Sequence, residues 1–207
     1  MSSILVTGAF PGEIDSIPNA TALGVGSIAA GISTTKLLLQ NHDVQLFLFL
    51  GSAGILQEDS HLLSTGDIVT CRYCSYFSIS QMEDKVKIPE IQKRTVTLAS
   101  PIPKLAEAHV ISTEGVSLQN LDKQTIQMQT GSFHAGIPNS LPILENLEVF
   151  GVASAIASVR PKLHVIFLLG ITNVVSENGS NEWKKNWRAV SHKVQKLATE
   201  LVSEFQT

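Results

Sequence analysis

The sequence predicts an α/β fold, organised as a single three-layer domain over residues 1–207. Short apolar runs with the length of buried strands alternate with segments of helical periodicity. The run at 46–50 (LFLFL) is apolar at every position, which requires helices on both faces of the sheet that contains it. No repeat or low-complexity linker divides the chain, and 207 residues with 43% hydrophobic content suit one core.

The first half of the chain carries three predicted strands and one predicted helix. Strands are expected at 3–9, 44–50 and about 68–78, and the first leads through a Pro-Gly turn to Glu13. The segment 24–40 (GVGSIAAGISTTKLLLQ) predicts a helix whose small residues let it pack closely on the sheet.

The second half begins with the polar segment 80–105, for which no element is predicted. Strands are expected at 108–112, around 143–148 and at 163–171, and helices at 149–159 and 183–204. Along the last helix, apolar side chains recur every three or four residues and predict a core stripe: Trp183, Trp187, Val190, Val194, Leu197, Leu201 and Phe205.

Gly51–Gly54 (GSAG) directly follow the strand at 44–50 and predict a tight turn. In an open α/β sheet, ligands bind beyond the carboxyl ends of the strands, where such a turn would lie. The glycines would permit close approach, and Ser52 and the loop amides would supply hydrogen-bond donors. A plain turn without a ligand is the alternative.

Gly24 to Ala29 (GVGSIA) match the GxGxxA form of the dinucleotide-binding fingerprint. That fingerprint follows a long strand, whereas Pro18 and Asn19 lie just upstream here, and Asp43 is the only acid near the expected ribose-binding distance. Helix packing is the favoured interpretation. A nucleotide-dependent oxidoreductase stays an alternative that bound dinucleotide would reveal.

Composition and cysteine usage limit the partners. The formal net charge of −3 offers no basic face for nucleic acid, and no apolar run is long enough to span a bilayer. The N-terminus lacks the basic start of a secretory signal, so we expect a cytoplasmic protein that binds small molecules or other subunits. Cys71 and Cys74 form a CxxC without a second pair or nearby His, and residues three apart on a strand face opposite sides. We expect no metal and no cofactor.

Glu13 and Glu148 each lie at or just beyond the end of a predicted apolar strand. Hydrolysis of a glycosidic bond passes through a cationic, oxocarbenium-like state, which a carboxylate can stabilise while it activates water. A second carboxylate can accept hydrogen bonds from two neighbouring sugar hydroxyls. For each residue, a solvated surface position is the alternative.

Six stretches, in the right order, resemble the nucleoside phosphorylase and nucleosidase superfamily on its hydrolase branch. They are similar to the family's opening strand with its catalytic Glu, its GxGKxxAAxxTxxLL helix, its GSAGG loop, its xxGDxV strand, its Met-Glu helix start and its RxISD or RxISN segment. The matching stretches are ILVTGAFPGE, GVGSIAAGISTTKLL, FLGSAGIL, STGDIV, LENLEVFGVASAIA and LLGITNVV. The resemblance covers most of the chain and implies a central mixed, twisted sheet flanked by helices.

Within this branch, ENLE is similar to the E-N-M-E of futalosine hydrolases, and ITNVVSENGSNEW resembles their I-S-N-x-V followed by Trp. Methylthioadenosine/S-adenosylhomocysteine nucleosidases carry Asp at the position of Asn173. The resemblance therefore implies release of hypoxanthine from futalosine, a step of menaquinone synthesis, with a methylthioadenosine/S-adenosylhomocysteine-type nucleosidase as the alternative.

The resemblance also implies roles for ten residues. Glu13 matches the Glu that activates water, Glu148 the Glu that binds the ribose 2′- and 3′-hydroxyls, and Asn173 the catalytic residue that contacts the purine around N7. The other seven are expected to bind substrate, with Leu147 in place of the Met that packs on the sugar: Phe10, Ser52, Ala53, Gly54, Val116, Leu147 and Thr172.

Asn173 and the positions of the basic residues limit which leaving group and which nucleophile the protein could use. An amide donates a hydrogen bond but cannot deliver a proton, an assistance worth about a hundredfold to ten-thousandfold, so Asn173 suits a 6-oxopurine better than adenine. Phosphorolysis must hold a phosphate dianion, yet the first basic residue is Lys36 and the first Arg is Arg72. Water is therefore the expected nucleophile.

The chain departs from the family at two places. The family's Arg before the I-S-N or I-S-D segment is absent, and the loop that carries a purine-stacking aromatic residue reads STEGVSLQ. These departures leave open a nucleoside-binding protein without catalysis. Because family members form dimers, the resemblance implies a homodimer.

Overall fold

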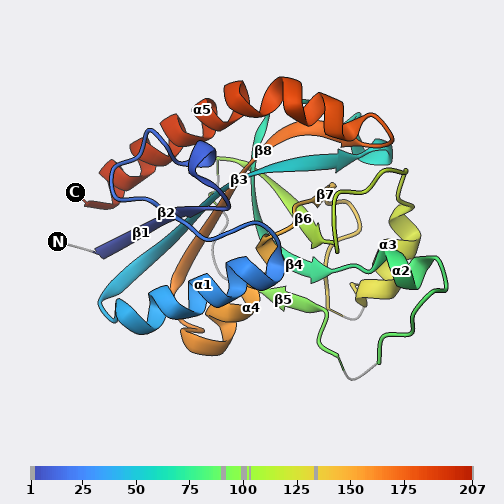
Figure 1. Ribbon diagram of the computed structural model, residues 1–207, viewed down its shortest axis with the longest axis horizontal. Helices are drawn as coiled ribbons and strands as arrows, with labels where there is room; N and C mark the ends of the chain where they lie inside the picture. The colour runs from blue at the N-terminus through green and yellow to red at the C-terminus, as the bar shows by residue number, and fades with distance from the viewer. Residues whose placement is uncertain (1–2, 90–91, 99–101, 103, 133–134, 207) are drawn as a thin grey trace.

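The computed structural model describes residues 3–89, 92–98, 102, 104–132 and 135–206, and it contains a mixed sheet with helices on both faces (Figure 1). The strands are β1 (Ser3–Gly8), β2 (Thr21–Ala22), β3 (Val44–Leu56), β4 (Ile68–Tyr76), β5 (Thr95–Thr97), β6 (Ala106–Ser112), β7 (Ile143–Glu145) and β8 (His164–Val175). The helices are α1 (Ser27–Gln40), α2 (Ile79–Met82), α3 (Lys123–Thr130), α4 (Val149–Val159) and α5 (Gly179–Gln206), with single 3-10 turns η1 (Pro11–Glu13) and η2 (Gln57–Asp59).

Side chains of β3 alternate between two core layers. Phe47 and Phe49 pack in the layer that includes α1 and α4, whereas Leu48 and Leu50 pack in the layer that includes α5. Figure 1 shows α5 along one side of the sheet and α1 with α4 along the other. The predicted α/β fold, with a mixed sheet between helices, is confirmed. Across the described residues, no helix combines the length and the apolar character that a membrane crossing requires.

Five strands pair in a closed ring that runs from β3 through β8, β4, β6 and β7 back to β3. The ring closes because the last residues of β3 pair in parallel with β8 on one side and antiparallel with β7 on the other. This part of the sheet is therefore not the open kind that the sequence reasoning assumed.

The prediction of a tight turn at Gly51–Gly54 is wrong. β3 runs unbroken through these residues, which pair with β8. Their glycines make room for neighbours: a Cβ on Gly51 would lie 2.9 Å from Cε1 of Phe49, and a Cβ on Gly54 would lie 2.8 Å from Nδ2 of Asn173. The stretch is thus a strand segment that accommodates side chains, instead of an elbow.

α1 packs in the core layer on the sheet through Ala30 and Leu38, and its small residues also allow a close crossing with α4. A Cβ on Gly31 would lie 3.1 Å from the carbonyl oxygen of Gly151, and a Cβ on Gly151 only 2.0 Å from that of Ser27. Upstream, Gly24 and Gly26 have φ of 95° and 89°, and the strand before them, β2, has two residues. So short a strand does not fit the dinucleotide fingerprint.

Several boundaries differ from those predicted. α4 covers the predicted 149–159, but β8 continues to Val175, so Thr172 and Asn173 are strand residues. α5 begins at Gly179 instead of 183. The short elements α2, β5 and α3 were not predicted, because segments of three to eight residues carry too little periodicity.

Cys71 and Cys74 lie in the same core layer, which corrects the prediction that they face opposite sides. A β-bulge leaves Arg72 unpaired between β4 and β6, and the extra residue brings both thiols to one side. Both are buried and free, and burial raises the pKa of the Cys71 thiol. Because thiol chemistry needs the thiolate, this pair belongs to the core.

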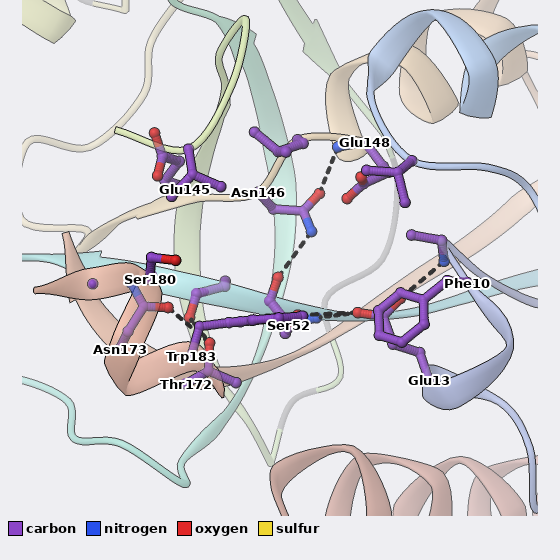
Figure 2. A pocket seen from close by; sticks show the side chains of 17 residues that line it. Phe10, Glu13, Ser52, Glu145, Asn146, Glu148, Thr172, Asn173, Ser180 and Trp183 are labelled. Atoms are coloured by element: carbon purple, nitrogen blue, oxygen red, sulfur yellow. Dashed lines mark hydrogen bonds between the residues drawn. The ribbon is translucent and has the colours of Figure 1, made fainter. Parts of the chain in front are cut away.

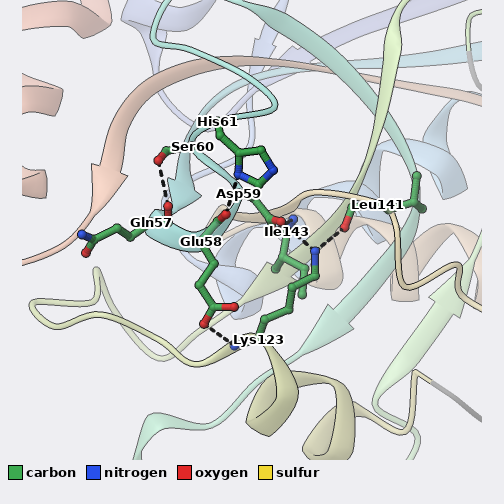
Figure 3. A network of polar contacts seen from close by, with 8 residues as sticks. All are labelled: Gln57, Glu58, Asp59, Ser60, His61, Lys123, Leu141 and Ile143. Atoms are coloured by element: carbon green, nitrogen blue, oxygen red, sulfur yellow. Dashed lines mark hydrogen bonds and ion pairs between the residues drawn. The ribbon is translucent and has the colours of Figure 1, made fainter.

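A partly buried ion pair ties η2, which follows β3, to α3 and β7 (Figure 3). Lys123 Nζ lies 2.7 Å from Asp59 Oδ1, and Asp59 Oδ2 accepts a hydrogen bond of 2.8 Å from the amide of Ile143. Lys123 Nζ also donates to the carbonyl oxygen of Leu141 at 2.9 Å. The Asp59 carboxylate thereby anchors the first residue of β7, the short strand that ends at Glu145.

Replacing Asp59 with Ala should lower the free energy of unfolding by about 3 kcal/mol, because it leaves the Lys123 ammonium and the Ile143 amide without their partner. Denaturant unfolding of the two proteins measures the difference. Glu83→Ala, which breaks the exposed Glu83–Lys85 pair, is the matched control and should change stability far less. An Asp59→Ala protein as stable as the wild type would contradict the anchoring role.

Candidate functional site

A pocket of about 410 Å³ lies where the second half of β3 meets β7, β8 and the starts of α4 and α5 (Figure 2). Its volume is in the usual range for small-molecule sites. All ten residues singled out from the sequence line it: Phe10, Glu13, Ser52, Ala53, Gly54, Val116, Leu147, Glu148, Thr172 and Asn173. Seven residues that were not assigned to a site also line it: Ala9, Val25, Glu145, Asn146, Gly179, Ser180 and Trp183.

Glu13 is buried at one end of the pocket, with both carboxylate oxygens fixed by the chain around it. The single turn η1 returns the side chain toward β1, where the amide of Ala9 donates to Oε2 at 2.9 Å. The amide and hydroxyl of Ser52 both donate to Oε1, at 2.9 and 3.0 Å. The carboxyl group therefore has one orientation, set by β1 and β3 together.

The pKa of Glu13 is raised from 4.5 to about 7, mainly by burial and to a smaller extent by the nearby charge of Glu148. The hydrogen bonds from Ala9 and Ser52 oppose this shift because they favour the ionised form. A carboxyl group that titrates near neutral pH can accept a proton and give it back, as a general base requires.

Glu148 enters the same pocket from the N-cap of α4. Its Oε1 accepts a hydrogen bond of 2.8 Å from the amide of Gly26, which the positive-φ turn before α1 presents. Asn146 Oδ1 accepts from the amides of Glu148 and Val149 at 3.0 and 2.9 Å, and its Nδ2 donates to the carbonyl oxygen of Ser52 at 2.9 Å. Asn146 thus caps α4 and joins it to β3. Burial raises the pKa of Glu148 as well.

Asn173 lies at the other end of the pocket, away from Glu13 and Glu148 (Figure 2). Its Nδ2 lies between two glycines, since a Cβ would be 2.8 Å away on Gly54 and 3.1 Å away on Gly179. Thr172 Oγ1 donates to Asn173 Oδ1 at 2.8 Å. Thr172 therefore orients the Asn173 amide, and Gly54 and Gly179 leave the space that it occupies.

Trp183 lines the pocket, which corrects its prediction as a core residue. Because α5 starts at Gly179, Trp183 lies beside the strand ends and its Nε1 donates to Ser52 Oγ at 3.1 Å. That donation directs the Ser52 hydroxyl proton toward Glu13. The Trp183 ring meets Phe10 edge-on, with ring centres 6.4 Å apart. Aromatic surface therefore comes from α5 and the turn before η1.

The remaining wall is apolar or small. Ala53 and Gly54 form part of the floor, and Leu147 lies between Asn146 and Glu148. Val25 and Val116 are 61% and 52% exposed at the mouth. No Lys or Arg is found among the described residues that line the pocket.

A signal for the missed residues was present in part. In the stretch ENLE, Asn146 lies two residues before the N-cap Glu148, and its side chain accepts from the amides two and three residues on, a local pattern that is common for Asn, so its role was readable. Glu145 is the residue before it and ends β7. Trp183 ends the stretch ITNVVSENGSNEW that carries the resemblance, but its apolar periodicity favoured a core position. Gly179 and Ser180 carry no such signal, because they reach the pocket only through the earlier start of α5.

No protein-family model and no curated protein sequence matches the chain. Solved structures do: a 5′-methylthioadenosine/S-adenosylhomocysteine nucleosidase from Helicobacter pylori, in complex with butyl-thio-DADMe-Immucillin-A, aligns with a TM-score of 0.74, 16% identity and 99% of both chains. A futalosine hydrolase of Helicobacter pylori aligns with a TM-score of 0.73, 15% identity and 98% of both chains. A Neisseria meningitidis 5′-methylthioadenosine/S-adenosylhomocysteine nucleosidase aligns with a TM-score of 0.70 and 12% identity, over 99% of this chain and 100% of that chain. At these identities the likeness establishes a common fold over the whole chain.

Proposed function

We propose that the protein is a nucleosidase that hydrolyses the N-ribosidic bond of a purine nucleoside. The observation that carries the proposal is the meeting of Glu13 and Glu148, 135 positions apart (148 − 13), in one pocket of suitable size. The fold shared with two kinds of nucleosidase supports it.

In this mechanism Glu13 accepts a proton from water while the water oxygen bonds to C1′ of the ribose. The C1′–N9 bond breaks, its electron pair leaves with the purine, and the purine anion then takes up a proton from solvent to give the neutral base. Glu148 Oε1 already accepts from Gly26, so Oε2 is available to the 2′- and 3′-hydroxyls. The negative charge of both carboxylates stabilises the positive charge that develops on the sugar.

The purine lies in this proposal at the end of the pocket with Asn173, whose amide donates to N7. An amide suits a 6-oxopurine leaving group, so our first choice is conversion of futalosine to hypoxanthine and dehypoxanthine futalosine, a step of menaquinone synthesis. A methylthioadenosine/S-adenosylhomocysteine-type nucleosidase is the second choice. We also propose that the protein forms a homodimer and requires no cofactor.

Water is the proposed nucleophile because a phosphate dianion would need cationic partners. The described lining residues include no Lys or Arg, and two carboxylates lie where the phosphate would have to bind. A phosphorylase is disfavoured on these grounds.

A base-release assay tests the proposal. The protein is incubated with futalosine, inosine, methylthioadenosine and S-adenosylhomocysteine, and free base is measured by chromatography. We expect hypoxanthine from futalosine. A nucleoside-binding protein without catalysis is the rival, favoured by Val116 in a loop without a stacking aromatic residue; nucleoside binding without base release would establish the rival.

Trp183→Phe should move the pH dependence of base release. Since Glu13 acts when deprotonated and has a pKa of about 7, wild-type kcat/KM should rise through that pH and then level off. Without Trp183 Nε1, the Ser52 hydroxyl is free to turn away from Glu13, which removes a hydrogen bond that lowers the Glu13 pKa. The rising limb should therefore shift to higher pH.

The matched control for this prediction is Trp187→Phe. Trp187 stacks on Trp183 with ring centres 5.8 Å apart but does not line the pocket. Its substitution should leave the pH profile in place. Identical profiles for the Trp183 variant and the wild type would contradict the relay through Ser52.

A further inference from the structure

Glu145 is a third carboxylate in the pocket, and the mechanism above does not use it. It is 6% exposed, ends β7 and lines the cavity. Figure 2 shows it at the end of the pocket with Asn173, away from Glu13 and Glu148. A buried carboxylate that faces a ligand cavity requires hydrogen-bond donors, and part of these can come from the ligand.

Strand register places Glu145 opposite Asn173. Both residues are paired with Gly54 of β3, Glu145 from β7 on one side and Asn173 from β8 on the other. Two strand spacings separate their Cα atoms by about 10 Å, and paired residues of neighbouring strands point to the same face. Gly54 has no side chain to fill the space between them. This leaves a floor on which a two-ring base fits, with one polar side chain at each edge.

The carboxylate of Glu145 has unused acceptor capacity. Its Oε1 accepts from Thr113 Oγ1 at 3.0 Å, from the Ser117 hydroxyl and from the Ser117 amide at 3.3 Å. Its Oε2 receives only a second, 3.3 Å contact from the same amide. A carboxylate offers about four lone-pair positions, so Oε2 can accept at least one more donor.

We propose that Glu145 selects the base: its Oε2 accepts the N1–H of a 6-oxopurine, while Asn173 binds the five-membered ring at the opposite edge. This inference rests on the proposed function and names its substrate class. Adenine carries a lone pair at N1 in place of a proton, so that atom would face the carboxylate without a hydrogen bond. A 6-oxopurine nucleoside therefore binds and reacts in preference to its 6-amino counterpart.

The pKa of the Glu145 carboxyl group is raised overall. Burial raises its pKa, and the hydrogen bonds from Ser117 and Thr113 lower it. One further donor from the base would favour the ionised carboxylate.

Glu145→Gln tests the inference with two pairs of nucleosides that differ only at position 6: inosine with adenosine, and 5′-methylthioinosine with methylthioadenosine. Gln keeps the size of the side chain but presents an NH₂ group that can donate to N1 of adenine. The ratio of kcat/KM for the 6-oxo over the 6-amino member should fall by about tenfold to a hundredfold, the effect of one hydrogen bond to a charged group.

Glu177→Gln is the matched control. Glu177 is an exposed carboxylate in the loop after β8 that does not line the pocket, so this variant should keep the wild-type ratio. Should Glu145→Gln fail to fold, Glu145→Asp carries the test, because it keeps the charge but withdraws it from the base and should also lower the ratio. An unchanged ratio in a folded, active variant overturns the inference and leaves the proposed hydrolysis intact.

If the wild type releases no base, measurements of base binding test the role of Glu145 separately from the proposed hydrolysis. Calorimetry then compares hypoxanthine with adenine on the wild type and the Glu145→Gln variant. A wild-type preference for hypoxanthine that the variant loses supports the role of Glu145 although hydrolysis has failed. Equal preferences in both proteins, or no binding of either base, overturn it.

Discussion

Glu13→Gln should abolish base release while the protein continues to bind nucleoside. Gln has the shape of Glu but cannot take a proton from water, and general-base assistance is worth about a hundredfold to ten-thousandfold. The variant keeps an acceptor for either Ala9 or Ser52, so the pocket should hold its form. Base release under saturating nucleoside measures kcat, and calorimetry measures the dissociation constant.

The control for this variant is Asp15→Asn, which removes a carboxylate two positions along the chain. Asp15 is exposed and accepts a hydrogen bond from Gln195, outside the pocket. It should retain wild-type kcat. Wild-type turnover in the Glu13→Gln protein would mean that another group activates the water, and the proposed mechanism would be wrong.

Glu148→Gln should weaken both nucleoside binding and turnover, because the same carboxylate grips the ribose in the ground state and as positive charge develops. Loss of a hydrogen bond to a charged group predicts a decrease in kcat/KM of about tenfold to a hundredfold. Removing this charge also removes one cause of the raised Glu13 pKa, so the pH profile should shift to lower pH.

A deoxynucleoside tells ribose binding apart from general damage to the pocket. The 2′-deoxy form of the best substrate lacks one hydroxyl that Glu148 is proposed to hold. The wild type should discriminate strongly against it, and the Glu148→Gln variant much less. Undiminished discrimination by the variant would show that Glu148 does not bind the diol.

Residue order and periodicity were enough to predict the long elements of this chain, whereas most of the pocket residues were predicted from the family resemblance. The largely apolar β3 and β8 and the eleven-residue α4 have patterns that packing between helix layers imposes. Glu13 and Glu148 were found because their motifs are local. That they meet in one pocket was predicted only from the resemblance, since no local pattern brings η1 and the N-cap of α4 together.

The failures have physical causes in long-range pairing. Gly51–Gly54 have the composition of a turn, yet β8 on one side and β7 on the other keep them extended. The unpaired Arg72 brings Cys71 and Cys74 to the same face of the sheet, where opposite faces were expected. Trp183 fits the apolar stripe of α5, and only the start of that helix at Gly179 carries it beyond the sheet to the pocket. In each case the deciding partner is distant in sequence.

The closed ring of strands makes the floor of the pocket resistant to local unfolding. β3 supplies the pocket floor at Ala53 and Gly54, where it pairs with β8, and from Gly54 onward it also pairs with β7 on its other side. Local opening reaches segments with few buried contacts first and such doubly bonded strands last. The floor of the pocket should therefore stay folded while residues at its mouth fluctuate. Ligand binding should be lost only on global unfolding.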